Sequence, residues 1–106
     1  MYEHIVAFQF RTELSAAQEE DLLRQLRSFR GRIPGIVSMS AGRNATHETD
    51  NVHGFTLGLR ITFEDREALL AYGPHPVHQQ FVASLAGLLE RVVVVDYEIA
   101  KETGDA

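Results

Sequence analysis

The sequence contains no cysteine and no tryptophan, and it has only three prolines among 106 residues. Without cysteine, neither a disulfide framework nor a thiol nucleophile can be part of this protein. No stretch approaches the roughly 20 apolar residues of a membrane-spanning helix, so we expect no membrane partner. The N-terminal residues also lack the basic stretch and long apolar run of a signal peptide, which leads us to expect a cytoplasmic protein.

Positive charge is scarce as well. Ten lysines and arginines face fifteen acidic residues, for a net charge of −5. The four arginines between positions 24 and 32 come closest to a basic cluster, but three acids at positions 19–21 precede them. Acidic residues early and basic residues late on a helix complement the helix dipole. We therefore expect no nucleic-acid partner, since such proteins neutralise phosphates with dense basic surfaces.

Apolar residues that recur at every second position predict β-strands. His4, Val6 and Phe8 share one face of a strand over residues 2–11. Residues 53–63 alternate with period two, and His53 begins this strand on its apolar face. A further strand is expected over residues 36–42. Residues 44–52 are polar and predict a surface loop, in which His47 is most simply a solvated side chain.

Three helical segments are expected between these strands. Ser15 and Gln18 match a capping box, and the apolar stripe that follows predicts a helix up to Pro34-Gly35. Glu64 or Asp65 caps a short helix that carries Tyr72. Gly73-Pro74 breaks this helix, and Pro76 suits the first turn of another, with His75 near its cap. The members of the last helix that share one side are His78, Phe81, Val82, Leu85 and Leu89.

The valine run at residues 92–95 is so uniformly apolar that it predicts a central strand. The resulting order is β-α-β-β-α-β, an α+β pattern of the ferredoxin-like, split-βαβ kind. It predicts a four-stranded antiparallel sheet with helices on one face. A second copy could cover the open face and complete a dimeric α/β barrel, so we expect a homodimer. We expect one domain over residues 1–100 and a frayed tail at residues 101–106.

Two histidines fall on surfaces expected to face each other. His4 lies on the apolar face of its strand, and His78 is the one strongly polar member of its helical stripe, with Tyr72 nearby. A lone histidine on an apolar face is more often a hydrogen-bonded core residue, and that alternative stays open. Asp96 alternates with the valines of the last strand, an unfavourable place for a carboxylate unless it pairs or the strand end reaches water. An inward His-Asp pair would orient the imidazole as a base.

Several motifs together resemble one protein family. The Ile33-Pro34-Gly35-Ile36 turn, the strand end Thr62-Phe63-Glu64, the run at residues 71–81 and the closing Val95-Asp96-Tyr97 are similar to the stress-responsive dimeric α/β-barrel (Dabb) family. With His4, the resemblance covers roughly residues 2–98. Its most specific part is the Tyr-x-x-His-Pro-x-His segment that begins at Tyr72. The resemblance implies a ferredoxin-like fold that two chains pair into a barrel.

The family includes a plant polyketide cyclase that catalyses an intramolecular aldol condensation, and its pocket residues imply roles for this chain. Tyr72 and His78 match its tyrosine and histidine, while His4 and Asp96 stand at matching positions. This chain departs from the cyclase at Leu57, where the cyclase has a further pocket histidine. The residues expected to line a pocket for a small apolar or aromatic ligand are His4, Leu57, His75 and Phe81.

Three functional hypotheses follow. In the first, the protein is a cofactor-free cyclase- or lyase-like enzyme in which His78 is a general base, Tyr72 donates to a developing enolate and Asp96 orients an imidazole. In the second, the same pocket binds a small molecule without catalysis, in a stress-related role. In the third, His75 and His78 bind a metal, although two ligands are too few for a closed zinc site.

Overall fold

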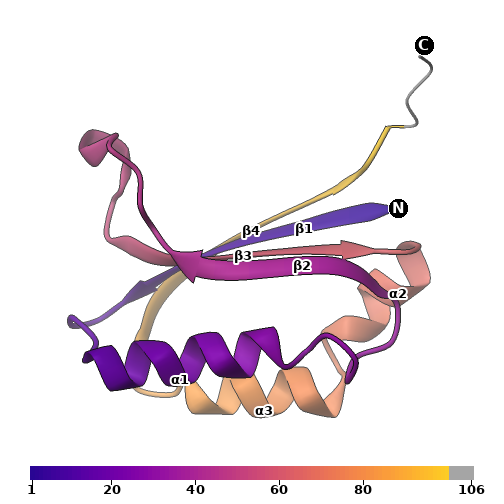
Figure 1. The fold of residues 1–106 in the computed structure, drawn as a ribbon, viewed down its shortest axis with the longest axis horizontal. Helices are drawn as coiled ribbons and strands as arrows, with labels where there is room; N and C mark the ends of the chain where they lie inside the picture. Colours follow the sequence, from indigo (N-terminus) through magenta and orange to yellow (C-terminus); the bar gives the residue numbers. More distant parts are fainter. Residues whose placement is uncertain (101–106) are drawn as a thin grey trace.

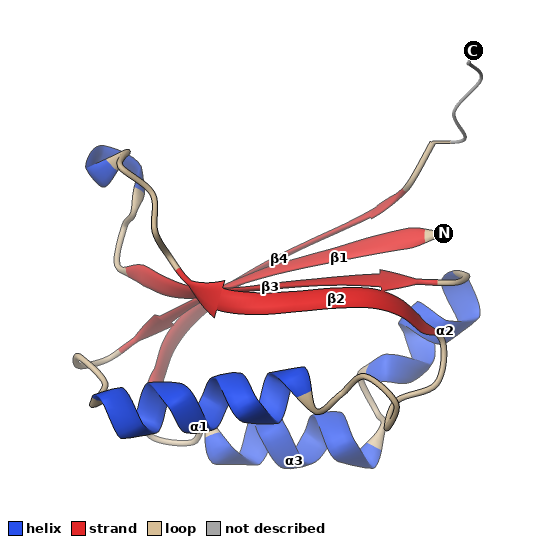
Figure 2. Cartoon of the chain, viewed as in Figure 1, coloured by secondary structure: helices blue, strands red, loops and turns tan. Residues whose placement is uncertain are grey.

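The computed structural model describes residues 1–100, and the expected tail at residues 101–106 lies outside this range. The chain folds into a four-stranded sheet with its three α-helices packed on one side (Figures 1 and 2). The strands are β1 (Tyr2–Phe10), β2 (Ile36–Arg43), β3 (Phe55–Phe63) and β4 (Leu89–Glu98). The helices are α1 (Ala16–Arg27), α2 (Arg66–Tyr72), α3 (Pro76–Ser84) and the short 3-10 turn η1 (Thr49–Asn51).

The strands lie in the order β2-β3-β1-β4, and every neighbouring pair is antiparallel. This order and the element sequence confirm the predicted ferredoxin-like α+β fold. Within residues 1–100, no helix is both long enough and apolar enough to cross a membrane.

Helix α1 begins as predicted and ends earlier than predicted. The Ser15 hydroxyl accepts the Gln18 N–H, and the Gln18 side chain accepts the Ser15 N–H, which completes the capping box. The helix stops at Arg27, because the Ser28 hydroxyl bonds the Gln25 carbonyl and Gly31 adopts a φ of 85°. The turns that follow still bury Phe29 and Ile33, so the apolar stripe was correct although the predicted helix was too long.

The core lies between the helices and the inward face of the sheet. Its largest fully buried side chains are Phe29, Phe63, Leu23, Leu26 and Ile61. A tight contact holds α2 near the start of β2: a side chain at Gly35, whose φ is 87°, would overlap the β-carbon of Ala68. Only glycine fits this position.

The prediction for His53 was wrong. His53 and Gly54 both have positive φ, at 50° and 82°, and they form the turn before β3. The strand starts at Phe55. The left-handed backbone at His53 interrupts the alternation that had included it in the strand, so His53 does not share a strand face with Leu57.

The prediction of a central position for the valine run was also wrong. β4 is an edge strand, and Val92 to Val95 are 45–52% exposed. The helical layer does not cover this edge. Val92 and Val94 line a cavity on the helix side of the sheet. Val93 and Val95 alternate with them and lie on the open face. Each face thus uses two of the valines, which explains why the run is apolar on both faces.

The last helix is shorter than the predicted stripe. α3 ends at Ser84, with Leu85 at its C-cap, and Leu89 already begins β4. The caps of α2 and α3 were correctly predicted. The Asp65 carboxylate accepts the Ala68 N–H, and Nδ1 of His75 accepts the Val77 N–H at the start of α3.

Candidate functional site

A cavity of about 470 Å³ lies between the sheet and helices α2 and α3, toward the β4 edge. Four polar side chains, those of His4, Tyr72, His78 and Asp96, line it. The apolar lining residues are Val6, Phe8, Leu59, Leu69, Leu70, Phe81, Val82, Leu85, Leu89, Val92 and Val94. The cavity is thus an apolar space with one group of titratable side chains, the usual composition of a small-molecule site.

Strand register brings His4 and Asp96 together. The two residues are direct partners across the β1–β4 pair, so their side chains project from the same face of the sheet. Nδ1 of His4 lies 2.5 Å from Oδ1 of Asp96. His4 is buried, whereas the Asp96 side chain is 40% exposed at the strand edge. An ionised carboxylate only accepts hydrogen bonds, so Nδ1 of His4 is the donor in this pair. The other ring nitrogen, Nε2, takes no part in it.

The break between α2 and α3 fixes His78. Nδ1 of His78 lies 2.8 Å from the Gly73 carbonyl oxygen, which also accepts the side-chain amide of Gln79. A carbonyl can only accept, so Nδ1 of His78 is protonated and the lone pair of the neutral ring is on Nε2. The Gly73 carbonyl can accept these donors because the helix ends at Tyr72 and does not use it.

Tyr72 lies between the two histidines. Its ring centroid is 5.1 Å from that of His4 and 4.4 Å from that of His78. Phe29 and Phe63 also pack against the Tyr72 ring, with centroids 5.9 and 5.2 Å away. Burial raises the pKa of Tyr72 above its usual value of 10.0, and the charge of Asp96 raises this pKa further. The phenol therefore keeps its proton and acts as a hydrogen-bond donor.

The pKa of His78 shifts in the direction that a base requires. Burial lowers it below the usual 6.5, and charge on His4 and His75 lowers it further. The hydrogen bond to the Gly73 carbonyl acts in the opposite direction and does not outweigh burial. His78 is consequently neutral at pH 7, with Nε2 able to take a proton.

The reactive atoms of these side chains remain accessible. Among residues 1–100, the one buried side-chain nitrogen or oxygen without a hydrogen-bond partner is Oε1 of Gln9. The Tyr72 hydroxyl and Nε2 of His4 and of His78 make no hydrogen bond within these residues either. These three atoms are therefore not fully buried, and their side chains line the cavity.

The sequence-derived site residues divide into two groups. His4, Tyr72, His78, Phe81 and Asp96 all line the cavity, as the sequence indicated. The other two residues expected there are Leu57, which is a buried core residue, and His75, which lines a separate groove beside Pro34 and Glu64. Asp96 bonds His4, so the imidazole that it orients is not that of His78.

Sequence reasoning missed the Gly73 carbonyl as the partner of His78. The signal was present in the Gly-Pro and Pro76 pattern, because a broken helix leaves carbonyls without helical partners. Reasoning from side chains alone does not detect such a backbone group.

The two histidines of the metal hypothesis face different cavities. Nδ1 of His75 already accepts the Val77 N–H, and Nδ1 of His78 donates to the Gly73 carbonyl. Across residues 1–100, no three His, Cys, Asp or Glu side chains gather closely enough to hold a metal ion. The placement of the rings therefore gives a His75–His78 metal site no support.

A ferredoxin-like chain with a histidine–tyrosine cavity defines the class of this protein, and comparison with known proteins gives its family. Residues 2–99 match the stress responsive A/B barrel domain (Dabb) family. The chain belongs to this family.

An enzyme and two solved structures illustrate the similarity to known proteins. The chain is similar to olivetolic acid cyclase of Cannabis sativa, with 26% identity over 94 residues, covering 89% of this chain and 92% of the cyclase. It is also similar to the structure of At3g17210 from Arabidopsis thaliana, with 25% identity, a TM-score of 0.83 and coverage of 97% and 99% of the two chains. A dimeric ferredoxin-like protein of unknown function from Jannaschia sp. CCS1 has 25% identity, a TM-score of 0.77 and coverage of 92% and 98%.

Proposed function

We propose that this protein is a cofactor-free acid–base catalyst that enolises a small aromatic or apolar carbonyl compound, in the manner of a polyketide cyclase-like lyase. The observation that carries the proposal is the pairing of two groups in one apolar cavity. His78 is neutral with its lone pair on Nε2, and Tyr72 is a protonated donor whose ring lies 4.4 Å from the His78 ring.

The proposed reaction needs only these groups. Nε2 of His78 removes a proton from the carbon next to the substrate carbonyl, and the electron pair of the broken C–H bond moves onto the carbonyl oxygen. The Tyr72 hydroxyl donates a hydrogen bond to that oxygen as its negative charge develops. The His78 imidazolium then returns the proton to the product. A buried base with a lowered pKa suits this role near neutral pH.

Asp96 and His4 form a second unit at the same end of the cavity. Asp96 holds His4 through Nδ1, which leaves Nε2 of His4 available to a substrate in the cavity that His4 lines. We assign Asp96 as a positioning residue for His4, and His4 and Phe81 as substrate-contacting residues. The similarity to olivetolic acid cyclase supports a cyclase-like reaction, and Leu57 is a reason not to assign the same substrate.

We also propose that the protein acts as a homodimer. The face of the sheet opposite the helices exposes apolar residues, among them Val93, Val95 and Tyr97. Such a surface on a small domain is typical of an interaction site. The Jannaschia protein, which has a similar fold, is dimeric.

A tautomerisation assay tests the catalytic proposal. Benzoylacetone, an aryl β-diketone, is diluted from dry organic solvent, where its enol dominates, and its approach to equilibrium in buffer is followed by ultraviolet absorbance. We expect the protein to accelerate this step. His78→Ala should reduce the acceleration by about 10²–10⁴-fold, the usual contribution of a general base. Tyr72→Phe should reduce it by about 10²–10³-fold, as for loss of one oxyanion donor.

The matched control is His47→Ala, which removes an exposed histidine in the β2–β3 loop and should leave the rate unchanged. Full activity of a folded His78→Ala protein would refute the role of His78. Binding of benzoylacetone without any acceleration, detected by nuclear magnetic resonance, would instead support the non-catalytic ligand-binding alternative.

A further inference from the structure

The open face of the sheet carries a polar network at one end. Thr62 donates its hydroxyl hydrogen bond to Oε1 of Glu3, and Nη1 of Arg60 reaches Oγ1 of Thr62 at 2.8 Å. The same Nη1 lies 3.3 Å from Oγ of Ser38 and 3.5 Å from Oε1 of Glu3. This network is independent of the catalytic cavity, because Glu3 and Arg60 lie on the opposite face from His4 and Ile61.

Glu3 and Arg60 form a loose ion pair within the chain, at 3.5 Å, and other charged atoms of both side chains make no hydrogen bond. Within residues 1–100, Oε2 of Glu3 and both Nε and Nη2 of Arg60 make no hydrogen bond. The Glu3 side chain is already only 13% exposed, and the Arg60 side chain is 38% exposed. A protein that covers this face would remove the remaining water from both groups. It would have to supply an acceptor for Arg60 and a donor for Glu3, or the cost would be severe.

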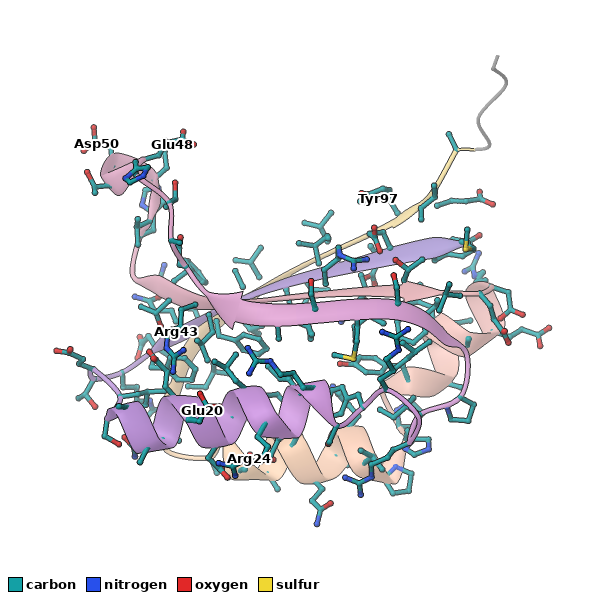
Figure 3. All side chains as sticks on the ribbon, viewed as in Figure 1. Glu20, Arg24, Arg43, Glu48, Asp50 and Tyr97 are labelled. Carbon is teal, nitrogen blue, oxygen red and sulfur yellow. The ribbon has the colours of Figure 1, made fainter. Side chains whose placement is uncertain are left out.

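Strand register arranges the open face in three rows across the sheet. The rows, each read from β2 to β4, are Ser38-Thr62-Glu3-Tyr97, Ser40-Arg60-Ile5-Val95 and Gly42-Gly58-Ala7-Val93. The β4 side of each row is bulky and apolar, and Figure 3 shows Tyr97 on the side of the sheet away from the helices. The β2 side is small, and nothing lies within 4 Å of a β-carbon built at Gly42.

The bulky β4 side of one copy can pack against the small β2 side of a second copy under one two-fold rotation. A two-fold axis along the strands would stack β4 of one copy over β2 of the other, so that bulky side chains fill the space above the glycines. The alternative axis, across the strands, would stack β2 over β2 and β4 over β4, so that small side chains face small ones and leave a void while bulky side chains meet bulky ones. Because protein interfaces pack as densely as interiors, the first arrangement is strongly favoured.

The favoured rotation also supplies charged partners for Glu3 and Arg60. It keeps each residue at its position along the strand and lays β1 over β3 of the second copy. Glu3 then stands beside Arg60 of that copy, one row away. We infer that Glu3 and Arg60 form two symmetric ion pairs between copies and thereby determine which chain this one accepts as its partner. This inference rests on the homodimer proposed above and adds the residues that select the partner.

A charge-exchange experiment tests the pairing. Arg60→Glu makes both positions acidic and Glu3→Arg makes both basic, so each variant should repel itself. Because like charges repel at such an interface, we expect each homodimer dissociation constant to rise at least about 100-fold by sedimentation equilibrium. An equimolar mixture should form a heterodimer, because the two acidic positions of the first variant then face the two basic positions of the second.

Two control variants reverse charges that lie off this face. Arg30→Glu and Glu13→Arg change exposed residues in the turns after α1 and β1, and should leave the dissociation constant unchanged. Circular dichroism verifies the fold of each variant. If one charge-reversed chain does not fold alone, co-expression of the two decides, since a folded heterodimer supports the inference and its absence refutes it.

The other outcomes are distinct. A mixture that remains monomeric while the unmodified protein dimerises would overturn the inter-chain pairing and leave the homodimer standing. Variants that dimerise as tightly as the unmodified protein would do the same. An unmodified protein that stays monomeric at all concentrations would overturn both the pairing and the homodimer.

Discussion

Adjacent residues on β1 serve two surfaces with opposite properties. His4 points under the helices into the cavity, where it meets Asp96, its partner in the strand register. Glu3 points to the open face, where it bonds Thr62. In the first pair His4 is buried beneath the helices while the Asp96 side chain is 40% exposed at the strand edge. In the second pair the Glu3 side chain is 13% exposed and Thr62 is buried, although no helix covers that face. Burial on the helix side also raises the pKa of Tyr72 and lowers the pKa of His78.

The same deletion on the two faces should give very different stability changes. Val6 is 5% exposed under the helices, and Val95 is 52% exposed on the open face. Val6→Ala removes two buried carbons and leaves a cavity, so we expect a loss of about 2–3 kcal/mol in the free energy of unfolding by urea titration. Val95→Ala should cost less than about 0.5 kcal/mol under dilute conditions. Equal losses would mean that the open face is covered even in the isolated chain.

Removing the carboxylate that holds His4 should have a somewhat smaller effect. Asp96→Ala leaves Nδ1 of buried His4 without its partner, and we expect a loss of about 1–2 kcal/mol in thermal or urea unfolding. Glu98→Ala, on the same strand and in none of the ion pairs of residues 1–100, is the matched control and should change stability little. If Asp96→Ala leaves the free energy of unfolding unchanged, water replaces the carboxylate at no cost. Asp96 would then not be needed to position His4.

The smallest expected effect is a pH dependence of stability from His78. Its folded pKa lies below the usual 6.5, so on acidification the unfolded chain takes up this proton first. Stability should therefore fall as the pH drops from 6.5 to the folded pKa, and this contribution should level off below that. Urea midpoints measured between pH 7 and 5 should change less in His78→Gln than in the unmodified protein. His47→Gln, at an exposed position, should keep the original slope. An unchanged slope in His78→Gln would show that its pKa is not lowered.

The sequence predicted the fold well where periodicity was strong. The alternation from Phe55 to Phe63 and the capping box at Ser15 correctly predicted β3 and the start of α1. The end of α1 could not be predicted, because it depends on the hydrogen bond of Ser28 and the backbone conformation of Gly31. The position of β4 could not be predicted, because it depends on how far the helices extend across the sheet. Sequence pattern describes a strand's own composition and does not say which elements cover it.

The sequence indicated which polar residues lie near the cavity, and it did not indicate which groups hydrogen-bond each other there. His4, Tyr72, His78 and Asp96 were all identified as polar residues on or near apolar faces, and all line the cavity. That Asp96 bonds His4 follows from the β1–β4 register, and that His78 bonds Gly73 follows from the local helix break. Both partnerships are three-dimensional facts that residue type alone does not specify.

The edge position of β4 has a consequence for handling the protein in solution. The outer side of this strand has no neighbour in the described sheet, so its backbone groups there can pair with another strand. Val92 to Val95 form an uncharged β-branched run, the composition that favours cross-β assembly when it is exposed. Arg91 and Asp96 flank the run and act as charged gatekeepers against it. Conditions that separate the chains, or substitutions that remove these two charges, should therefore promote fibril formation along this edge.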